Sequence, residues 1–145
     1  MISVVPYFPE HAWALAREHC FPCIGNDPLV YARELWTDGT AFSAMNERHE
    51  VVACGGVKPL WAGVGMAWSM LTPAVRAHPF FLHRETLKVL HKVVKTHSLH
   101  RVELIVLDEF AAGKKWAKAL GFVSEGIRKW YTPDKRNIEM FVRFF

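Results

Sequence analysis

The sequence predicts a mixed α/β fold in which helices cover both faces of one mixed sheet. Two apolar segments, residues 65–71 and Arg101–Leu107, have the length and composition of buried strands, and an amphipathic segment at about Pro79–Thr96 separates them. A strand, a crossover helix and a second strand in this order form a right-handed unit with parallel strands. Helices and strands alternate only in part along the rest of the chain, which predicts a mixed sheet.

The first half of the chain is expected to supply a strand, two helices and a hairpin. Apolar residues at helical spacing follow Pro9, and Pro28 suits the first turn of a second helix. A five-residue loop, 46–50, then joins two strands. In order, these elements are expected at residues 2–8, 9–20, 28–38, 40–45 and 51–57, before a loop at 61–65.

The second half continues from the strand Arg101–Leu107 into a short helix that ends at Leu120-Gly121-Phe122. Two further strands, 124–131 and 138–144, flank the segment 132–137, which has the composition of a turn. The complete order is therefore βααβββαβαββ. The length of 145 residues fits one domain that spans residues 1–145.

The composition is that of an ordinary globular protein with an excess of positive charge. Hydrophobic residues make up 51% of the chain. No apolar run approaches the ~20 residues of a membrane-spanning helix. The net charge of +4 favours anionic partners such as nucleotides, CoA phosphates, nucleic acids or acidic proteins. Three cysteines, with no signal-peptide pattern, indicate a cytoplasmic protein without a membrane partner.

Two short motifs lie where this order of elements would bind a ligand. The first is Leu71-Thr-Pro73-Ala-Val-Arg76 at the end of the central strand, and the second is Leu120-Gly121-Phe122. Together with the order of elements, they make the chain resemble the GNAT superfamily of acetyl-CoA-dependent N-acyltransferases over nearly its whole length. The resemblance implies that the strand end pairs with pantetheine and that the following turn holds the pyrophosphate of acetyl-CoA. It implies cofactor contacts from Leu71, Pro73, Arg76, Ala77, His78 and Phe110.

The chain departs from the family pattern at positions that serve cofactor binding and catalysis. Pro79 and Phe81 stand where the turn has glycines, which removes one amide and places a bulky ring beside the pyrophosphate path. Ala117 replaces the tyrosine that protonates the departing thiolate, and Phe110 replaces an asparagine. The central strand carries no carboxylate to deprotonate an amine. Tyr131 is the proposed substitute acid.

A second likeness is carried by short runs around the central strands. The chain is similar here to GNAT-like proteins of tailed bacteriophages, which are grouped with an internal virion protein family. This likeness implies a phage or prophage origin, a cytoplasmic or virion-associated location, and a phage or host protein as partner. The residues that carry it are Ala53-Cys-Gly-Gly-Val57, Gly63-Val-Gly-Met-Ala-Trp68, Thr72, His78-Pro79 and Phe81.

The sequence leaves two main interpretations open. The leading one is an N-acyltransferase that uses acetyl-CoA on an unidentified amine. It predicts that the two central strands splay apart to leave an open cleft, and it fails if Phe81 or Trp116 fills that cleft. The alternative is a catalytically inactive GNAT scaffold that binds a virion or host protein. A third class, nucleic-acid binding, would use a basic stripe on the long helix, but a solvated face explains this stripe better. The stripe consists of Arg84, Lys88, Lys92 and Lys95.

Cysteine and tryptophan residues offer further candidates. Cys20 and Cys23 have the spacing of a redox or zinc-binding pair, but they follow a helix and no second pair is present. We therefore expect buried small side chains and no metal site. Trp61, Trp116 and Trp130 are expected in the core, with an acceptor-side or partner-binding surface as the alternative.

Overall fold

The computed structural model describes residues 1–19 and 28–145. Across these residues, seven strands form one sheet in the order β1-β2-β3-β4-β5-β7-β6. β4 and β5 are parallel, and the other neighbouring pairs are antiparallel. The strands are β1 (Ser3–Pro6), β2 (Ala41–Met45), β3 (Val51–Trp61), β4 (Val64–Leu71), β5 (Arg101–Leu107), β6 (Val123–Arg128) and β7 (Ile138–Phe144).

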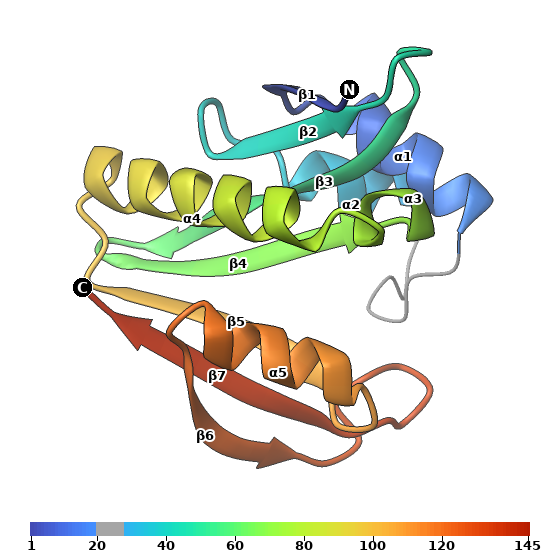
Figure 1. The fold of residues 1–145 in the computed structure, drawn as a ribbon. Coiled ribbons are helices and arrows are strands. Elements are labelled where there is room, and N and C mark those ends of the chain that lie inside the picture. The colour runs from blue at the N-terminus through green and yellow to red at the C-terminus, as the bar shows by residue number, and fades with distance from the viewer. Residues whose placement is uncertain (20–27) are drawn as a thin grey trace.

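Helices lie on both faces of this sheet, as the sequence predicted. Figure 1 shows α4 and α5 in front of the sheet and α1 and α2 behind it. β4, α4 and β5 form the predicted unit of two parallel strands and a crossover helix. The predicted order of elements is confirmed, with the addition of a one-turn helix, α3. The helices are α1 (Pro9–Glu18), α2 (Pro28–Glu34), α3 (Pro73–Arg76), α4 (Pro79–Thr96) and α5 (Ala111–Ala119).

Side chains alternate along β4 and enter two separate apolar cores. Ala67 packs toward α4 and α5, in a cluster that includes the fully buried Val93 and Phe141. Trp68 and Met70 pack on the other face, with residues of α1 and α2. The central strand is therefore covered on both sides, which explains why its sequence is apolar almost throughout.

β4 and β5 pair over a short distance and then separate. Their register runs from Val64 opposite Arg101 to Met66 opposite Glu103. Beyond Met66, β4 stays with β3 and β5 stays with β7, so the two strands diverge (Figure 1). The predicted splay is thus present, whereas the open cleft expected with it stays a prediction. It divides the sheet into an N-terminal wing (β1–β4) and a C-terminal wing (β5, β7 and β6).

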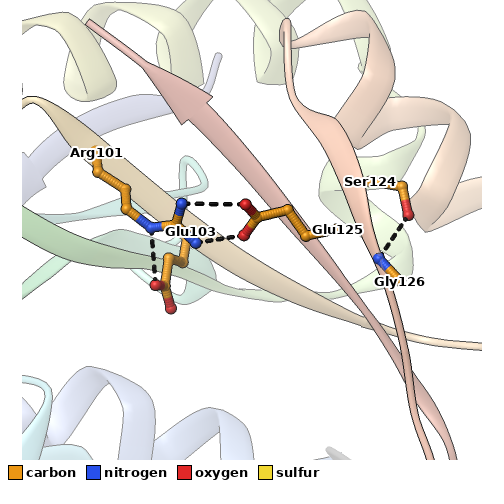
Figure 2. A network of polar contacts seen from close by, with 5 residues as sticks. All are labelled: Arg101, Glu103, Ser124, Glu125 and Gly126. Atoms are coloured by element: carbon orange, nitrogen blue, oxygen red, sulfur yellow. Dashed lines mark hydrogen bonds and ion pairs between the residues drawn. The ribbon is translucent and has the colours of Figure 1, made fainter.

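The C-terminal wing carries α5 on one face and a network of charges on the other. Arg101 on β5 donates from Nε to Glu103 at 3.0 Å and from both terminal nitrogens to Glu125 on β6 (Figure 2). These contacts cross over β7, where Val142 lies opposite Glu103 and is 1% exposed. The hydrogen bonds from Arg101 lower the pKa of Glu125. The network therefore joins the two outer strands of the wing and shields its apolar centre.

The loop expected at 61–65 is wrong, because β3 and β4 form a longer hairpin. β3 continues to Trp61 and β4 begins at Val64, which leaves a two-residue turn. Gly63 in this turn has a φ of +81°, a conformation that favours glycine. A Cβ at this position would also lie 2.1 Å from the ring of His100. The glycine therefore permits both the tight turn and its contact with the start of β5.

Two other boundaries differ from the prediction. The strand expected at 124–131 ends at Arg128, and Trp130 with a φ of +53° turns the chain away from the extended conformation. Tyr131 consequently lies in the β6–β7 loop. The second helix ends at Glu34 instead of residue 38. Cys20 and Cys23 lie outside the described residues.

Candidate functional site

The candidate site lies where the parallel strands end. β4 leads into α3 and α4 there, and β5 leads into α5. The β6–β7 loop reaches the same end, because the Asp108 amide donates to the Asn137 carbonyl at 3.0 Å. The open edges of two strands, two helix starts and a loop therefore converge at this end of the sheet (Figure 1).

The open edge of β4 directs peptide groups toward β5. Thr72 N–H donates to the Val52 carbonyl of β3 at 3.1 Å, which fixes the alternation of the strand. In an antiparallel pair, the N–H and C=O of one residue point to the same side and those of the next residue to the other. The peptide groups of Ala67, Ser69 and Leu71 therefore face β5 beyond Met66 and Glu103, the last pair of the two strands. The region where β4 and β5 have separated is called the opening.

The amides at the end of α3 form hydrogen bonds within the turn, whereas a phosphate-binding turn would leave them free. Its first residue is Pro73, a position that suits proline. The donors that follow are bonded within the turn at 2.9–3.3 Å: Arg76 to Thr72, Ala77 to Pro73, and His78 to Val75. Pro79, at the start of α4, has no N–H to donate. Arg76, Ala77 and His78 therefore offer no free amide, whereas the N–H groups of Phe80 and Phe81, in the first turn of α4, have no intrahelical acceptor.

Arg76 and Phe110 meet across the opening. The guanidinium carbon of Arg76 lies 5.7 Å from the centre of the Phe110 ring. Arg76 ends α3 and Phe110 precedes α5, so this cation–π contact joins the two sides. The ring of Phe110 also covers Gly113, where a Cβ would lie 2.6 Å from it. Two residues proposed from the sequence as cofactor contacts are thus neighbours.

The other sequence-predicted cofactor residues are more dispersed. Leu71 is partly buried against the cluster around Val75, whereas Pro73 and Ala77 are exposed. His78 lines an open depression of about 360 Å³ whose opposite wall is the β2–β3 turn with Arg48. This side chain therefore faces the N-terminal wing.

Ala117, at the family's acid position, and Tyr131, the proposed substitute, lie in different environments. Ala117 is 2% exposed and belongs to the core under α5. Tyr131 is 45% exposed in the β6–β7 loop, where its N–H donates to the Arg136 carbonyl at 2.9 Å. An ion pair between Arg136 and Glu109 ties this loop to the β5–α5 connection. Tyr131 is therefore an exposed hydroxyl at the same end of the sheet as the opening.

The layer formed by α4 and α5 concentrates positive charge. α4 contains four Lys or Arg residues and one Glu, and α5 contains three Lys and no acid. Their formal charge is +6, whereas that of the whole chain is +4, so the remainder carries −2. Lys115 and Lys118 are exposed and form no ion pair within the described residues. Sequence reasoning missed these two lysines, although the composition of the short helix signals them.

Polar groups on the α1/α2 side are buried and unreactive. Tyr7 donates from its hydroxyl to the Ala32 carbonyl at 2.8 Å, and burial raises its pKa. Burial also raises the pKa of Cys54, which disfavours its thiolate. Trp68 lies with its ring 5.2 Å from that of Tyr7, and its Nε1 has no hydrogen-bond partner in the structure described. These groups pack the face behind β4.

Exposed aromatic residues occupy both ends of the sheet. Trp61 is 66% exposed and Trp130 is 71% exposed, so the expectation of core packing is wrong for these two. Both lie at turns, where the chain leaves the sheet before the ring can be covered. Trp116 is partly buried against the core under α4 and α5. Phe80, in the first turn of α4, is 90% exposed.

Two features are absent from the described residues, 1–19 and 28–145. In this part of the chain, no group of three or more His, Cys, Asp or Glu side chains is arranged to hold a metal ion. None of the helices described there is both long and apolar enough to cross a membrane.

Known proteins resemble this chain in structure and not in sequence. No family model and no curated protein matches it. A ribosomal-protein-S18-alanine N-acetyltransferase from Escherichia coli matches with a TM-score of 0.75 at 16% identity, covering 98% of this chain and 92% of that one. The NatC complex bound to Gag peptide and CoA contains a chain with a TM-score of 0.76 at 14% identity, covering 99% and 98%.

A third matching structure is that of a GNAT-family protein. An acetyltransferase of the GNAT family from Streptococcus pneumoniae matches with a TM-score of 0.72 at 12% identity, covering 100% of this chain and 99% of that one. At these identities the likeness establishes the fold. The chain therefore has the GNAT fold.

Proposed function

We propose that this chain transfers an acyl group from a pantetheine thioester, with acetyl-CoA as the first candidate, to an amine. The observation that carries the proposal is the opening between β4 and β5, into which the peptide groups of Ala67, Ser69 and Leu71 point. Pantetheine contains amides that can bond to such an edge as an added strand would. The acetyltransferase folds that match the whole chain support the same class of reaction.

The residues fit one part of acetyl-CoA better than the other. The open edge of β4 suits the pantetheine arm, and Leu71, Arg76 and Phe110 are its proposed neighbours. The pyrophosphate finds few backbone donors, because the amides of Ala77 and His78 are bonded within the turn and Pro79 has none, which leaves those of Phe80 and Phe81. Pro73, Ala77 and His78 remain proposed contacts through their side chains alone.

Acyl transfer requires two proton transfers, one from the amine and one to the thiolate. The amine nitrogen attacks the thioester carbonyl, the carbon–sulfur bond breaks, the amine loses a proton and the thiolate gains one. We assign the proton for sulfur to the hydroxyl of Tyr131, since Ala117 has no proton to give and is buried. Holding amine and thioester together can by itself lower the barrier by several kcal/mol, on the order of 7–11 in favourable cases.

The proposal is tested at Ser69, whose exposed side chain leaves the β3 ladder untouched. Ser69→Pro removes an N–H that faces the opening, whereas Ser69→Ala keeps it. Calorimetric titration with acetyl-pantetheine should show binding to the wild type and to Ser69→Ala, and a loss of about tenfold or more in Ser69→Pro. Thiol release in the presence of a panel of primary amines then reports transfer. Absence of thioester binding to the wild type would refute the proposal.

A second candidate is a catalytically inactive scaffold, of phage or prophage origin by its sequence likeness, that binds a virion or host protein. The observation that favours it is a set of exposed aromatic side chains at the end opposite the opening. Trp61 and Phe144 are 66% and 63% exposed, and Phe145 N–H donates to the His100 carbonyl beside them. A protein that binds no thioester, yet loses a partner when Trp61 is replaced by Ala, would establish this candidate.

A further inference from the structure

We propose that the acyl donor is a 4′-phosphopantetheine thioester carried on an acidic protein, and that the face formed by α4 and α5 docks this carrier. The inference rests on the proposed function, because it takes the pantetheine opening as given. It concerns the part of the donor beyond pantetheine, where the structure departs from a nucleotide site.

The first support is the number of phosphates that the site can hold. CoA continues from pantetheine into a pyrophosphate and a 3′-phosphate, whereas a protein-bound arm ends in a single phosphodiester. α3 leaves no free amide between Arg76 and Pro79. What remains beside the opening is the exposed guanidinium of Arg76, 5.7 Å from the ring of Phe110, together with the N–H groups of Phe80 and Phe81 at the start of α4. One forked cation suits one phosphate group.

The second support is the extent of the positive face. α4 has 18 residues and is therefore roughly 27 Å long, and its basic side chains run from Arg84 to Lys95, with Lys92 lying over the ring of Phe42 on β2 at 4.9 Å. Its one acid, Glu85, is held by Arg84 and Lys88 at 3.2 and 3.0 Å. Lys115 and Lys118 extend the charge onto α5. A nucleotide needs cations at one place, whereas an acidic protein surface complements charge that is spread over two helices.

The third support is an exposed aromatic side chain beside the opening. Phe80 is 90% exposed in the first turn of α4, and Phe110 is 41% exposed where the chain enters α5. Aromatic residues surrounded by charge are typical anchors of protein interfaces. A small donor that enters the opening has no need of them. Arg76, Phe110 and the start of α4, which carries Phe80, thus lie at the same end of the sheet as the opening.

The experiment compares four probes by calorimetry: an acidic acyl carrier protein from fatty-acid synthesis with its arm, the same protein without the arm, free 4′-phosphopantetheine, and CoA. Lys115→Glu/Lys118→Glu tests the docking face. Arg17→Glu/Arg33→Glu is the matched control, because it changes the net charge equally on α1 and α2, which cover the opposite face.

We expect the carrier with its arm to bind about tenfold or more tightly than the carrier without it, and than CoA. CoA and free 4′-phosphopantetheine should bind within about threefold of each other. The Lys115/Lys118 variant should weaken the carrier about tenfold and leave free 4′-phosphopantetheine unchanged, and the control should alter neither.

The outcomes separate the two proposals. CoA binding at least about tenfold tighter than 4′-phosphopantetheine would overturn this inference and leave the acyltransferase intact. So would a carrier that binds equally with and without its arm, or equal losses in the charge variant and its control. If no probe that contains pantetheine binds, both proposals fall.

Discussion

The two wings of the sheet are stabilised in different ways. The N-terminal wing is covered on both faces, by α4 on one side and by α1 and α2 on the other. The C-terminal wing has a core under α5, centred on Phe141, and an opposite face shielded by the charges of Arg101, Glu103 and Glu125. Its outer strand, β6, is exposed at every residue. The opening therefore lies between β4, which helices cover on both faces, and a wing that a helix covers on one face.

The cluster around Phe141 decides whether the wings are independent. It contains Val57 of β3 and Leu90 of α4 together with Val106 of β5, so we expect both wings to unfold in one transition. Phe141→Ala should lower the free energy of unfolding by about 3–5 kcal/mol, because it empties a fully buried site. Urea unfolding, followed by far-UV circular dichroism and by tryptophan fluorescence, measures the loss.

Leu15→Ala is the counterpart in the N-terminal wing. Leu15, on the buried face of α1, is 2% exposed, and its truncation should lower the free energy of unfolding by about 2–5 kcal/mol. Phe141→Ala could separate the transitions seen by circular dichroism and by fluorescence while Leu15→Ala does not. That result would show that the two wings are separate folding units and contradict the single transition expected.

A smaller effect is expected where the wings join. Gly65 is buried in the segment of β4 that pairs with β5, and a Cβ there would lie 2.6 Å from Val57 Cγ1 and 3.1 Å from Leu99 Cδ1. Gly65→Val should therefore cost about 1–3 kcal/mol through overpacking. Thermal unfolding measures this, with Ser69→Val, at an exposed site on the same strand, as the control. Equal losses of stability in both variants would show that the packing around Gly65 is no tighter than at an exposed position of β4.

The smallest effect is expected from the charged face of the C-terminal wing. Hydrogen bonds from Arg101 hold the pKa of Glu125 below its ordinary value of 4.5. A carboxyl whose pKa is lowered by folding contributes stability above its unfolded pKa and loses it as the pH falls through the folded pKa. Glu125→Gln should therefore lower the midpoint of thermal unfolding slightly near pH 7, and match the wild type well below pH 4.5.

Salt provides an independent check of the same contact. Exposed ion pairs are screened at about 1 M ionic strength, so the difference between Glu125→Gln and the wild type should shrink there. A difference that persists in both acid and salt would assign the role of Glu125 to packing over Val142 instead of charge.

The elements with strong periodicity were predictable from the sequence. The bounds of α4, β5 and β7 agree with the expectation, because Pro79 marks the start of a long amphipathic helix and both strands are compact apolar runs. The extension of β3 to Trp61 was not predictable from its own residues. It depends on the pairing of Trp61 with Val64 across the two-residue turn and on the fit of Gly63 against His100, which belongs to a distant segment.

The closeness of Arg76 and Phe110 fits the sequence prediction, whereas the backbone hydrogen bonding around them was not predictable. Arg76 and Phe110 were named from the sequence, and the structure brings them together. The closure of α3 was missed, although Thr72 followed by Pro73 is the pattern of a helix start. Which amides remain free depends on how the backbone bonds in three dimensions, and motif spacing does not report this. The pairing of α4 with α5 into one basic layer likewise depends on topology.

The position of β7 between β5 and β6 has a consequence for synthesis on the ribosome. β1 to β4 include three successive antiparallel pairs, and the N-terminal wing can assemble while later residues are still being added. β5 and β6 emerge before β7, yet neither is the other's neighbour. A nascent chain paused before Ile138 therefore presents two unpaired strand edges and the uncovered underside of α5. For that interval it is a substrate for chaperones and proteases, and the arrival of β7 ends the exposure by pairing with both strands at once.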